Sequence, residues 1–455
     1  MKVDIGEEYL SIQEKMYIIF CFLLCFAWSC VFLNDGYGPD EVMRFAIPKY
    51  IYETGTLPKG WEPSLINDIW GFSYGFFLSL PYLTSALFMK IASFIAKPDY
   101  PLLIAARFSS VLSYTGIAFY AVRIGKKALS HQAKWVFVFL MTLTPQIVFL
   151  GTYTNLDSFA LFTVMMLLDA WIDCMDTDWN RRSSVKLGLA MGLCFLSYHF
   201  AYGYIVGSFL LYCFWYVKHH STVSFSRFLR NGFLVLGIVF LISGWVFIRN
   251  GILYDGDVFA FRIRQIYGEK YAAPGFKPSQ HITPLKEGYS ILGMLRNTDW
   301  IGLTLKSAVS MLGYMVIVAD PWVYRGFAVL YLVGGACGMI HVFPKHTKDL
   351  CSDRTLLLLA SLIASLVTLG LSLYYSWAVD YQAQGRYVLY AMPPVALIVS
   401  RGLEWLAEKI SCTMERSEFF QRVSVRVIGV FLMLCVFEAF IHCVVVFLPN
   451  TFTSG

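Results

Sequence analysis

Long apolar runs are the feature that most constrains the fold of this chain. Stretches of roughly 17–25 residues with few charges recur along the sequence, and this is the length that an α-helix needs to cross the hydrocarbon core of a bilayer. The composition agrees, because 57% of the 455 residues are hydrophobic and 15% are charged, whereas a typical soluble domain has about 25% charged residues. The sequence therefore predicts an all-α polytopic membrane protein.

We expect about 11–13 spanning helices in this chain. The candidate segments are residues 16–33, 72–96, 101–122, 134–150, 157–174, 187–201, 203–217, 231–249, 306–320, 322–343, 354–376, 387–403 and 426–448. No internal repeat or low-complexity linker divides residues 1–455, which predicts one integral domain. It would comprise an N-terminal helical module (16–249) with a first outer loop (34–71), a second outer loop (250–305) and C-terminal helices (306–455).

Clusters of Lys and Arg between the apolar runs indicate the orientation, because loops rich in these residues stay in the cytoplasm. Five clusters occur: Arg123/Lys126/Lys127/Lys134, Arg181/Arg182/Lys186, Lys218/Arg227/Arg230, Lys345/Lys348/Arg354 and Arg401/Lys409/Arg416/Arg422/Arg426. Placing all five inside predicts a cytoplasmic N-terminus and puts the two long loops outside. Full crossings at 72–96 and 306–320 would conflict with this placement, so either the positive-inside rule fails twice or these two segments dip into the membrane without crossing it. We favour the second alternative, because re-entrant backbone is tolerated where it lines a protein cavity.

An acidic pair, Asp40-Glu41, follows the first predicted helix in the outer loop. If Pro39 lies near a helix start, Asp40 and Arg44 are four residues apart and share a face. A carboxylate beside an arginine stays ionised at neutral pH, as a general base must. The alternative is helix capping, because Pro-Asp-Glu is a common first turn. The stretch from Val42 to Glu53 is amphipathic and predicts a short helix along the membrane surface.

Three further groups of polar residues lie at outer helix ends. Asn155 and Asp157 stand between two apolar runs, where they would contact a sugar, a phosphate or a divalent ion, or simply form a turn and a cap. Arg249 lies where a span enters the second outer loop, and Arg386 follows Gly385 at another outer end. An arginine fork suits phosphate, although each arginine could instead extend its charge to the interface.

Several kinds of site are not indicated by the sequence. It contains no Walker loop, no Gly-x-Gly-x-x-Gly and no Cys-x-x-Cys, and its 11 cysteines lie mainly in apolar runs, where free buried thiols are expected. His199 and His442 also lie in apolar runs and are expected to be packing residues. No basic run interleaved with aromatics suggests nucleic acid. An activated donor would therefore have to arrive on a lipid.

Taken in order, these motifs resemble those of the GT-C glycosyltransferase superfamily, which includes protein O-mannosyltransferases, aminoarabinose transferases and the catalytic subunit of oligosaccharyltransferase. The matching elements are Pro39-Asp40-Glu41, then Ala105-Ala106-Arg107-Phe108-Ser109, then Thr144-Pro145 before the Asn155/Asp157 turn, and a large outer loop. A closer likeness is to a bacterial membrane family without assigned function. It rests on Arg249-Asn250 with Tyr254 and Gly256-Asp257, and on Gln384-Gly385-Arg386-Tyr387 with Pro393. Arg44 departs from that family, in which a histidine is expected.

The resemblance implies a GT-C-like bundle, with the catalytic module in residues 16–249, that moves a sugar from a polyprenyl-phosphate donor to a cell-surface glycan, glycolipid or protein at the outer face of the cell membrane. Asp40 would be the general base, and Glu41 would orient the acceptor or support Asp40. The donor phosphate would be bound by Arg249, Arg386, Tyr387 and Gln384. Further substrate contacts would come from Arg44, Asn155, Asp157, Tyr254 and Asp257. In members that use a divalent cation, Mg²⁺ or Mn²⁺, Asp157 and Asp40 would hold it.

Three other functions remain open at this point. A transporter or flippase of a lipid-linked glycan predicts charged residues buried at mid-membrane, and the clearest charges within the spans are Asp169 and Glu438. A glycan polymerase or ligase would differ from the transferase mainly in its acceptor. An assembly subunit could keep the fold without activity.

Overall fold

The computed structural model describes residues 9–95, 99–342, 352–413 and 417–448. Its α-helices are α1 (Ile12–Val31), α2 (Glu41–Thr54), α3 (Leu80–Ser93), α4 (Asp99–Ala128), α5 (His131–Thr142), α6 (Pro145–Gly151), α7 (Asp157–Asp176), α8 (Arg181–Phe195), α9 (Gly203–His219), α10 (Phe225–Val239), α11 (Trp245–Leu253), α12 (Phe261–Tyr271), α13 (Ile291–Asn297), α14 (Trp300–Ser310), α15 (Pro321–Val342), α16 (Asp353–Ala378), α17 (Met392–Thr413) and α18 (Ser417–Phe447).

Shorter elements join these helices. They are the 3₁₀ turns η2 (Pro63–Leu65), η3 (Tyr74–Phe76), η4 (His199–Tyr202), η7 (Gly385–Tyr387) and η8 (Leu389–Ala391), the π-helical turn η5 (Phe240–Gly244), and the strands β1 (Met311–Leu312) and β2 (Ile317–Val318). The two strands pair antiparallel as a small hairpin. Lys345, Lys348 and Arg416, which contribute to the predicted cytoplasmic clusters, lie outside the described residues.

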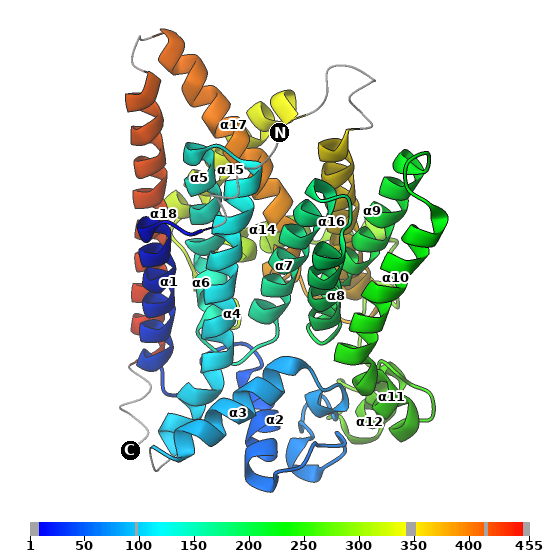
Figure 1. Cartoon of the computed structure of the whole chain (residues 1–455). Helices are drawn as coiled ribbons and strands as arrows, with labels where there is room; N and C mark the ends of the chain where they lie inside the picture. Colours follow the sequence, from blue (N-terminus) through cyan, green and yellow to red (C-terminus); the bar gives the residue numbers. More distant parts are fainter. Residues whose placement is uncertain (1–8, 96–98, 343–351, 414–416, 449–455) are drawn as a thin grey trace.

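Eight helical segments of the described chain are long and apolar enough to cross a membrane, or nine if α5 and α6, which meet at 57°, form one bent span. The multi-pass, all-α fold is therefore confirmed, but the predicted 11–13 spans are more than these criteria find. Two helices that the sequence analysis counted, α8 and α17, do not meet them. With 15 residues, α8 is about 22 Å long, and α17 carries charges at Arg401, Glu404, Glu408 and Lys409. Both nevertheless lie in the bundle (Figure 1).

The two segments expected to dip without crossing do not form spanning helices in the described residues. In 72–96 the structure has η3 and then α3, whose 14 residues are about 21 Å long. In 306–320 the chain leaves α14 at Ser310 and turns through the β1–β2 hairpin. The short helix predicted for Val42 to Glu53 is confirmed as α2, and its position along the membrane surface stays a prediction.

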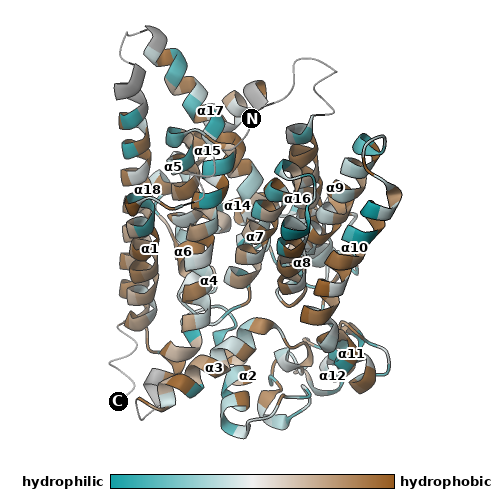
Figure 2. Cartoon of the chain, in the orientation of Figure 1, coloured by the Kyte–Doolittle hydropathy of each residue, from teal (hydrophilic) through white to brown (hydrophobic). Residues whose placement is uncertain are grey.

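The elements that follow the first and central spans gather at one end of the bundle, which we call the Asp40 end. Figure 1 shows α2, α3, α11 and α12 together there, whereas the first described residues of α1 and α5 lie toward the opposite end. Hydrophobic residues dominate the middle of the bundle, and hydrophilic residues become frequent toward its two ends (Figure 2). The two long loops thus lie at the same end of the bundle, as expected if both are on one side of the membrane.

Candidate functional site

Asp40 lies at the start of α2, but its carboxylate does not cap the helix. Its backbone is left-handed (φ 63°), and its side chain makes no capping hydrogen bond. A left-handed conformation costs a residue with a Cβ about 1–2 kcal/mol, and such strain gathers at functional sites. The Oδ2 atom instead accepts from Arg386 Nη2 at 3.0 Å, and the side chain keeps 25% of its surface exposed. The capping alternative therefore does not describe this residue.

The charges around Asp40 keep it ionised. Burial alone would raise the pKa of Asp40, but the guanidinium groups of Arg386 and Arg44 outweigh burial and lower that pKa below its ordinary value. The sequence analysis expected Arg44 to hold the carboxylate. In the structure Arg44 lies over the ring of Tyr74, 4.6 Å from its centroid, and donates to Tyr82 Oη at 3.4 Å. Arg44 thus contributes charge, and Arg386 makes the ion pair.

The guanidinium group of Arg386 is buried, and only one of its three nitrogen atoms makes hydrogen bonds among the described residues. Its Nη2 atom serves Asp40 and also donates to Tyr387 Oη at 2.8 Å. Its Nε and Nη1 atoms are buried and have no hydrogen-bond partner among the described residues. Each unsatisfied buried donor costs about 1–3 kcal/mol, and more when charged. A ligand with acceptor oxygens would remove this cost.

A chain of hydrogen bonds holds Arg386 and extends into the second outer loop. Tyr387 Oη donates to Gln382 Oε1 at 2.5 Å, and Gln382 Nε2 donates to Asp380 Oδ2 at 2.5 Å. The other oxygen of Asp380 lies 3.1 Å from His281 Nε2. The predicted residue Tyr387 therefore positions Arg386. For Gln384, another predicted phosphate ligand, the structure gives a backbone bond to Gln382 at 2.9 Å, so its role stays a prediction.

Gly385 permits the close approach that places Arg386. Its backbone N–H donates to Ser307 Oγ in α14 at 2.6 Å, and a Cβ at this position would lie 1.9 Å from the backbone nitrogen of Ala308. Only a residue without a side chain fits this close contact between the backbones of Gly385 and Ala308.

We expect Gly385→Ala to destabilise the protein by about 1–3 kcal/mol, because overpacking against rigid backbone forces a local shift. Gly370→Ala in α16 is the matched control, since a Cβ there meets nothing within 4 Å and alanine favours helix by about 1 kcal/mol over glycine. Thermal unfolding of the two purified variants measures the difference. Equal stability of both variants would contradict the expected clash.

Glu41 is fully buried and forms an ion pair with Arg107 of α4. Arg107 Nε and Nη2 donate to its two carboxylate oxygens at 2.8 and 2.7 Å, and the Thr154 N–H donates to Oε1 at 2.7 Å. Arg107 also donates to the backbone carbonyls of Ser29, Phe32 and Asn34. This arrangement fixes the end of α1, the start of α2 and the turn before α7 relative to one another. Both carboxylate oxygens of Glu41 are thus bonded to Arg107, and its expected role in orienting the acceptor or supporting Asp40 stays a prediction.

The turn before α7 brings a second carboxylate to the site. Asn155 is used internally, because its side chain bonds the Leu150 and Tyr153 carbonyls and the Ser158 N–H. Asp157 is buried; its Oδ1 accepts from Tyr390 Oη at 2.8 Å, while Oδ2 has no partner among the described residues. Tyr153 has a buried hydroxyl without a partner and lies within electrostatic range of Asp40, Arg44, Asp157 and Arg386. These side chains therefore face one shared region.

The remaining predicted residues form a different cluster. Arg249 Nη2 donates to the Pro58 carbonyl at 2.5 Å, and Tyr254 Oη donates to the Lys59 carbonyl at 2.8 Å. Asp257 accepts from two N–H groups at the start of α12. This cluster ties the second outer loop to the first. None of the hydrogen bonds or ion pairs of the described residues joins it to Asp40.

The residues that could hold a metal ion are elsewhere than expected. In the described chain, Asp320, Glu438 and His442 have ligand atoms within 4.8 Å of one another. The spacing Glu438-x-x-x-His442 on one helix was available as a signal, but His442 was read as packing. A cation between Asp40 and Asp157 would lie among the guanidinium groups of Arg386 and Arg44, which favour an anion there.

Comparison with known protein families gives one match. The model of the Alg9-like mannosyltransferase family matches residues 17–262, which is more than half of the chain and includes Asp40, Glu41, Arg107 and Asp157. No curated protein sequence matches the chain.

Solved structures with a similar fold are membrane glycosyltransferases. One is the oligosaccharyltransferase AglB from Archaeoglobus fulgidus with an inhibitory peptide and a dolichol-phosphate (TM-score 0.53, 15% identity, 95% of this chain and 56% of that one). The same enzyme in its apo form gives a TM-score of 0.55 at 14% identity over 95% of this chain and 57% of that one. ArnT from Cupriavidus metallidurans bound to undecaprenyl phosphate gives a TM-score of 0.52 at 10% identity. This match covers 96% of this chain and 76% of ArnT. The chain thus spans little more than half the length of the oligosaccharyltransferase.

Proposed function

The chain belongs to the Alg9-like mannosyltransferase family, and hence to the GT-C superfamily, and on this premise we propose that it transfers a sugar from a polyprenyl-phosphate carrier to an acceptor hydroxyl. The acceptor would be a cell-surface glycan, a glycolipid or a protein. Structural neighbours that contain dolichol-phosphate or undecaprenyl phosphate support this donor class.

One observation carries the proposal: an ionised, partly exposed carboxylate lies 3.0 Å from a buried arginine with two unused donors. Asp40 would take the proton of the acceptor hydroxyl, and the acceptor oxygen would form a bond to the anomeric carbon. The bond between that carbon and the phosphate oxygen would break, and the lipid phosphate would leave with the electron pair. Arg386 would stabilise the charge that develops on the phosphate. A single displacement inverts the anomeric configuration.

A divalent cation, Mg²⁺ or Mn²⁺, is the cofactor left open by the sequence analysis, and AglB has been solved with Zn and sulfate. In this chain we assign the charge balance of the leaving phosphate to Arg386 and Arg44, because both guanidinium groups are near Asp40. Asp157, with one free oxygen, would accept a hydrogen bond from a sugar hydroxyl.

We further propose that the Asp40 end faces the outside of the cell. The described members of the basic clusters support this, because Lys126 and Lys127 lie in the last turn of α4, and Arg181 begins α8. These positions are at the helix ends opposite to the Asp40 end (Figure 1). If α3 and α14 do not cross and α8 and α17 do, the described basic clusters all lie on one side of the membrane, as the positive-inside rule requires.

The test is sugar transfer in purified membranes supplied with one labelled donor at a time. We expect label to reach the acceptor from a polyprenyl-phosphate monosaccharide and not from a nucleotide sugar. Transfer of whole oligosaccharides from polyprenyl pyrophosphate would indicate a polymerase or ligase instead. Movement of the lipid-linked glycan across vesicles without a new glycosidic bond would establish the flippase alternative.

Substitution of Arg386 should separate its two roles. We expect Arg386→Gln to lower transfer by about 10²–10³-fold, as when one donor of an oxyanion-type site is removed. Without this guanidinium the effect of burial gains weight, so the pKa of Asp40 should rise and the acid limb of the pH–rate profile should move to higher pH. Arg386→Lys keeps the charge and should leave the acid limb closer to that of the wild type. Identical profiles for both variants and wild type would contradict the contact.

A further inference from the structure

A cluster of three side chains of the metal-binding types lies where α15 begins beside α18. Asp320 directly precedes α15, and Glu438 and His442 are four residues apart on α18, which places both on one face of that helix. One ligand atom of each side chain lies within 4.8 Å of the other two. None of the hydrogen bonds or ion pairs of the described residues joins this cluster to Asp40 or Arg386. The cluster is therefore no part of the proposed transferase site.

The two carboxylates of the cluster have no lysine or arginine as counter-charge among the described ion pairs. Glu438 Oε1 accepts from the Asp320 N–H at 2.8 Å and lies 3.4 Å from His442 Nδ1. The other oxygen, Oε2, is buried and has no hydrogen-bond partner in the described part of the chain. Glu438 also lies within an apolar span of α18, where a charge is costly unless it is paired. A cation would supply both the missing positive charge and a partner for Oε2.

The donor atoms and their spacing fit a transition-metal cation. An imidazole nitrogen together with carboxylate oxygens suits Zn²⁺, whereas Mg²⁺ and Ca²⁺ prefer oxygen ligands. Bonds from Zn²⁺ to nitrogen and oxygen are about 2.0–2.2 Å long, so two ligands of a tetrahedral ion lie about 3.4 Å apart. The distance between His442 Nδ1 and Glu438 Oε1 has this value. Asp320 is exposed, so water can reach the cluster and take the fourth position.

We propose that Asp320, Glu438 and His442 bind a divalent transition-metal cation, with Zn²⁺ as the best fit. The cation joins the start of α15 to α18. The β1–β2 hairpin ends just before Asp320, and Tyr314 in its turn accepts a hydrogen bond from the Asp40 N–H at 3.3 Å. The bound cation therefore fixes the base of this hairpin, which is a structural role that does not depend on the proposed sugar transfer.

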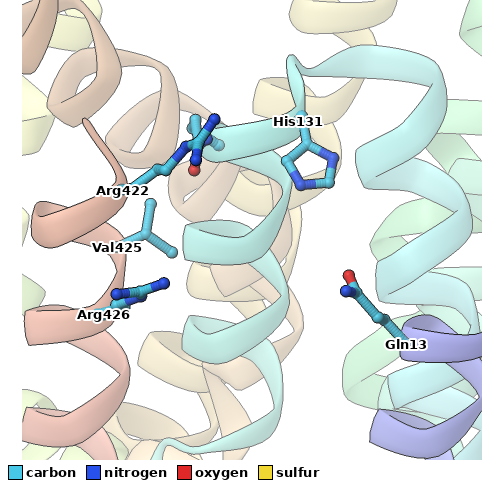
Figure 3. A pocket seen from close by; sticks show the side chains of 6 residues that line it. Gln13, His131, Arg422, Val425 and Arg426 are labelled. Atoms are coloured by element: carbon cyan, nitrogen blue, oxygen red, sulfur yellow. The ribbon is translucent and has the colours of Figure 1, made fainter. Parts of the chain in front are cut away.

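His131, at the opposite end of the bundle, provides a matched control. It lines a pocket whose other described lining residues are Gln13, Gln132, Arg422, Val425 and Arg426, with no carboxylate among them. Figure 3 shows His131 and the two arginines on different helices around this pocket. A lone imidazole near basic side chains is a poor site for a cation, so His131→Ala tests for binding by histidine in general.

The experiment measures Zn²⁺ bound by the purified full chain, without a histidine tag, after treatment with a chelator and reloading. Equilibrium dialysis with metal analysis should show one tightly bound Zn²⁺ per chain. His442→Ala should lower the affinity by about 100-fold or more, because loss of even an outer partner of a metal ligand costs about 10–100-fold. Glu438→Gln should act in the same way, although its amide oxygen can still accept from the Asp320 N–H. His131→Ala should bind Zn²⁺ as wild type does.

Two further measurements separate metal binding from a general effect on folding. Co²⁺ in place of Zn²⁺ should give the visible absorption of a tetrahedral site, and His442→Ala should abolish it. Zn²⁺ should raise the unfolding temperature of wild type but not that of His442→Ala or Glu438→Gln. Three outcomes would overturn the proposal: no Zn²⁺ bound by wild type, equal binding by wild type and both cluster variants, or an equal loss in His131→Ala. None of these outcomes depends on whether the chain transfers a sugar.

Discussion

Asp40→Asn should reduce sugar transfer by about 10²–10⁴-fold while the protein still folds, because a positioned general base contributes a factor of this size. The exchange keeps the shape of the side chain and removes the negative charge that pairs with Arg386. The change should appear in kcat, since the base acts as the acceptor oxygen attacks. Transfer kinetics with a saturating lipid-linked donor, on protein checked by thermal unfolding, give the measurement.

The matched control is Asp35→Asn, which removes the same charge from the same loop at a position that makes no hydrogen bond to Arg386 among the described residues. It should retain transfer within a few-fold of wild type. The wild-type rate should also hold as the pH falls from about 7 to about 5, since the pKa of Asp40 lies below its ordinary value of 3.8. A fully active, folded Asp40→Asn variant would falsify the assignment of the base.

The sequence was informative where function depends on local pattern. The apolar runs predicted the membrane helices, and Asp40 became a candidate base because a charged turn directly follows one of them. The failure of segments 72–96 and 306–320 to span was also predictable, since the basic clusters could not otherwise lie on one side. The number of spans was less predictable, because α17 combines an apolar face with four charges and α8 is short.

Local sequence patterns do not predict which residues from distant parts of the chain come into contact. Arg44 was the expected partner of Asp40 because it lies four residues away, but the ion pair is made by Arg386, 346 positions along the chain. The role of Arg107, by contrast, could have been predicted from the sequence. An arginine within an apolar run must find acceptors, and the nearby loop offered both Glu41 and unsatisfied carbonyls at the end of α1.

Glu41→Gln should lower the free energy of unfolding by about 3–5 kcal/mol, because it leaves the buried Arg107 without its counter-charge. Glu53→Gln on the same helix is the matched control. The pair of Glu53 with Lys49 is exposed and 4.0 Å long, so its loss should cost at most about 0.5 kcal/mol. Thermal and denaturant unfolding of the purified variants in one detergent compares them.

Loss of Arg107 should destabilise the protein more than loss of the Glu41 charge. Arg107→Met leaves the Glu41 carboxylate buried and also removes the donor from three backbone carbonyls, so it should destabilise the protein more than Glu41→Gln. For an isolated buried ion pair, replacing both partners by apolar residues is often neutral or stabilising. Here Glu41→Leu/Arg107→Met should stay destabilised, because the carbonyls of Ser29, Phe32 and Asn34 still lack their donor. Recovery of wild-type stability in the double variant would show that the carboxylate alone explains why Arg107 is buried at the end of α1.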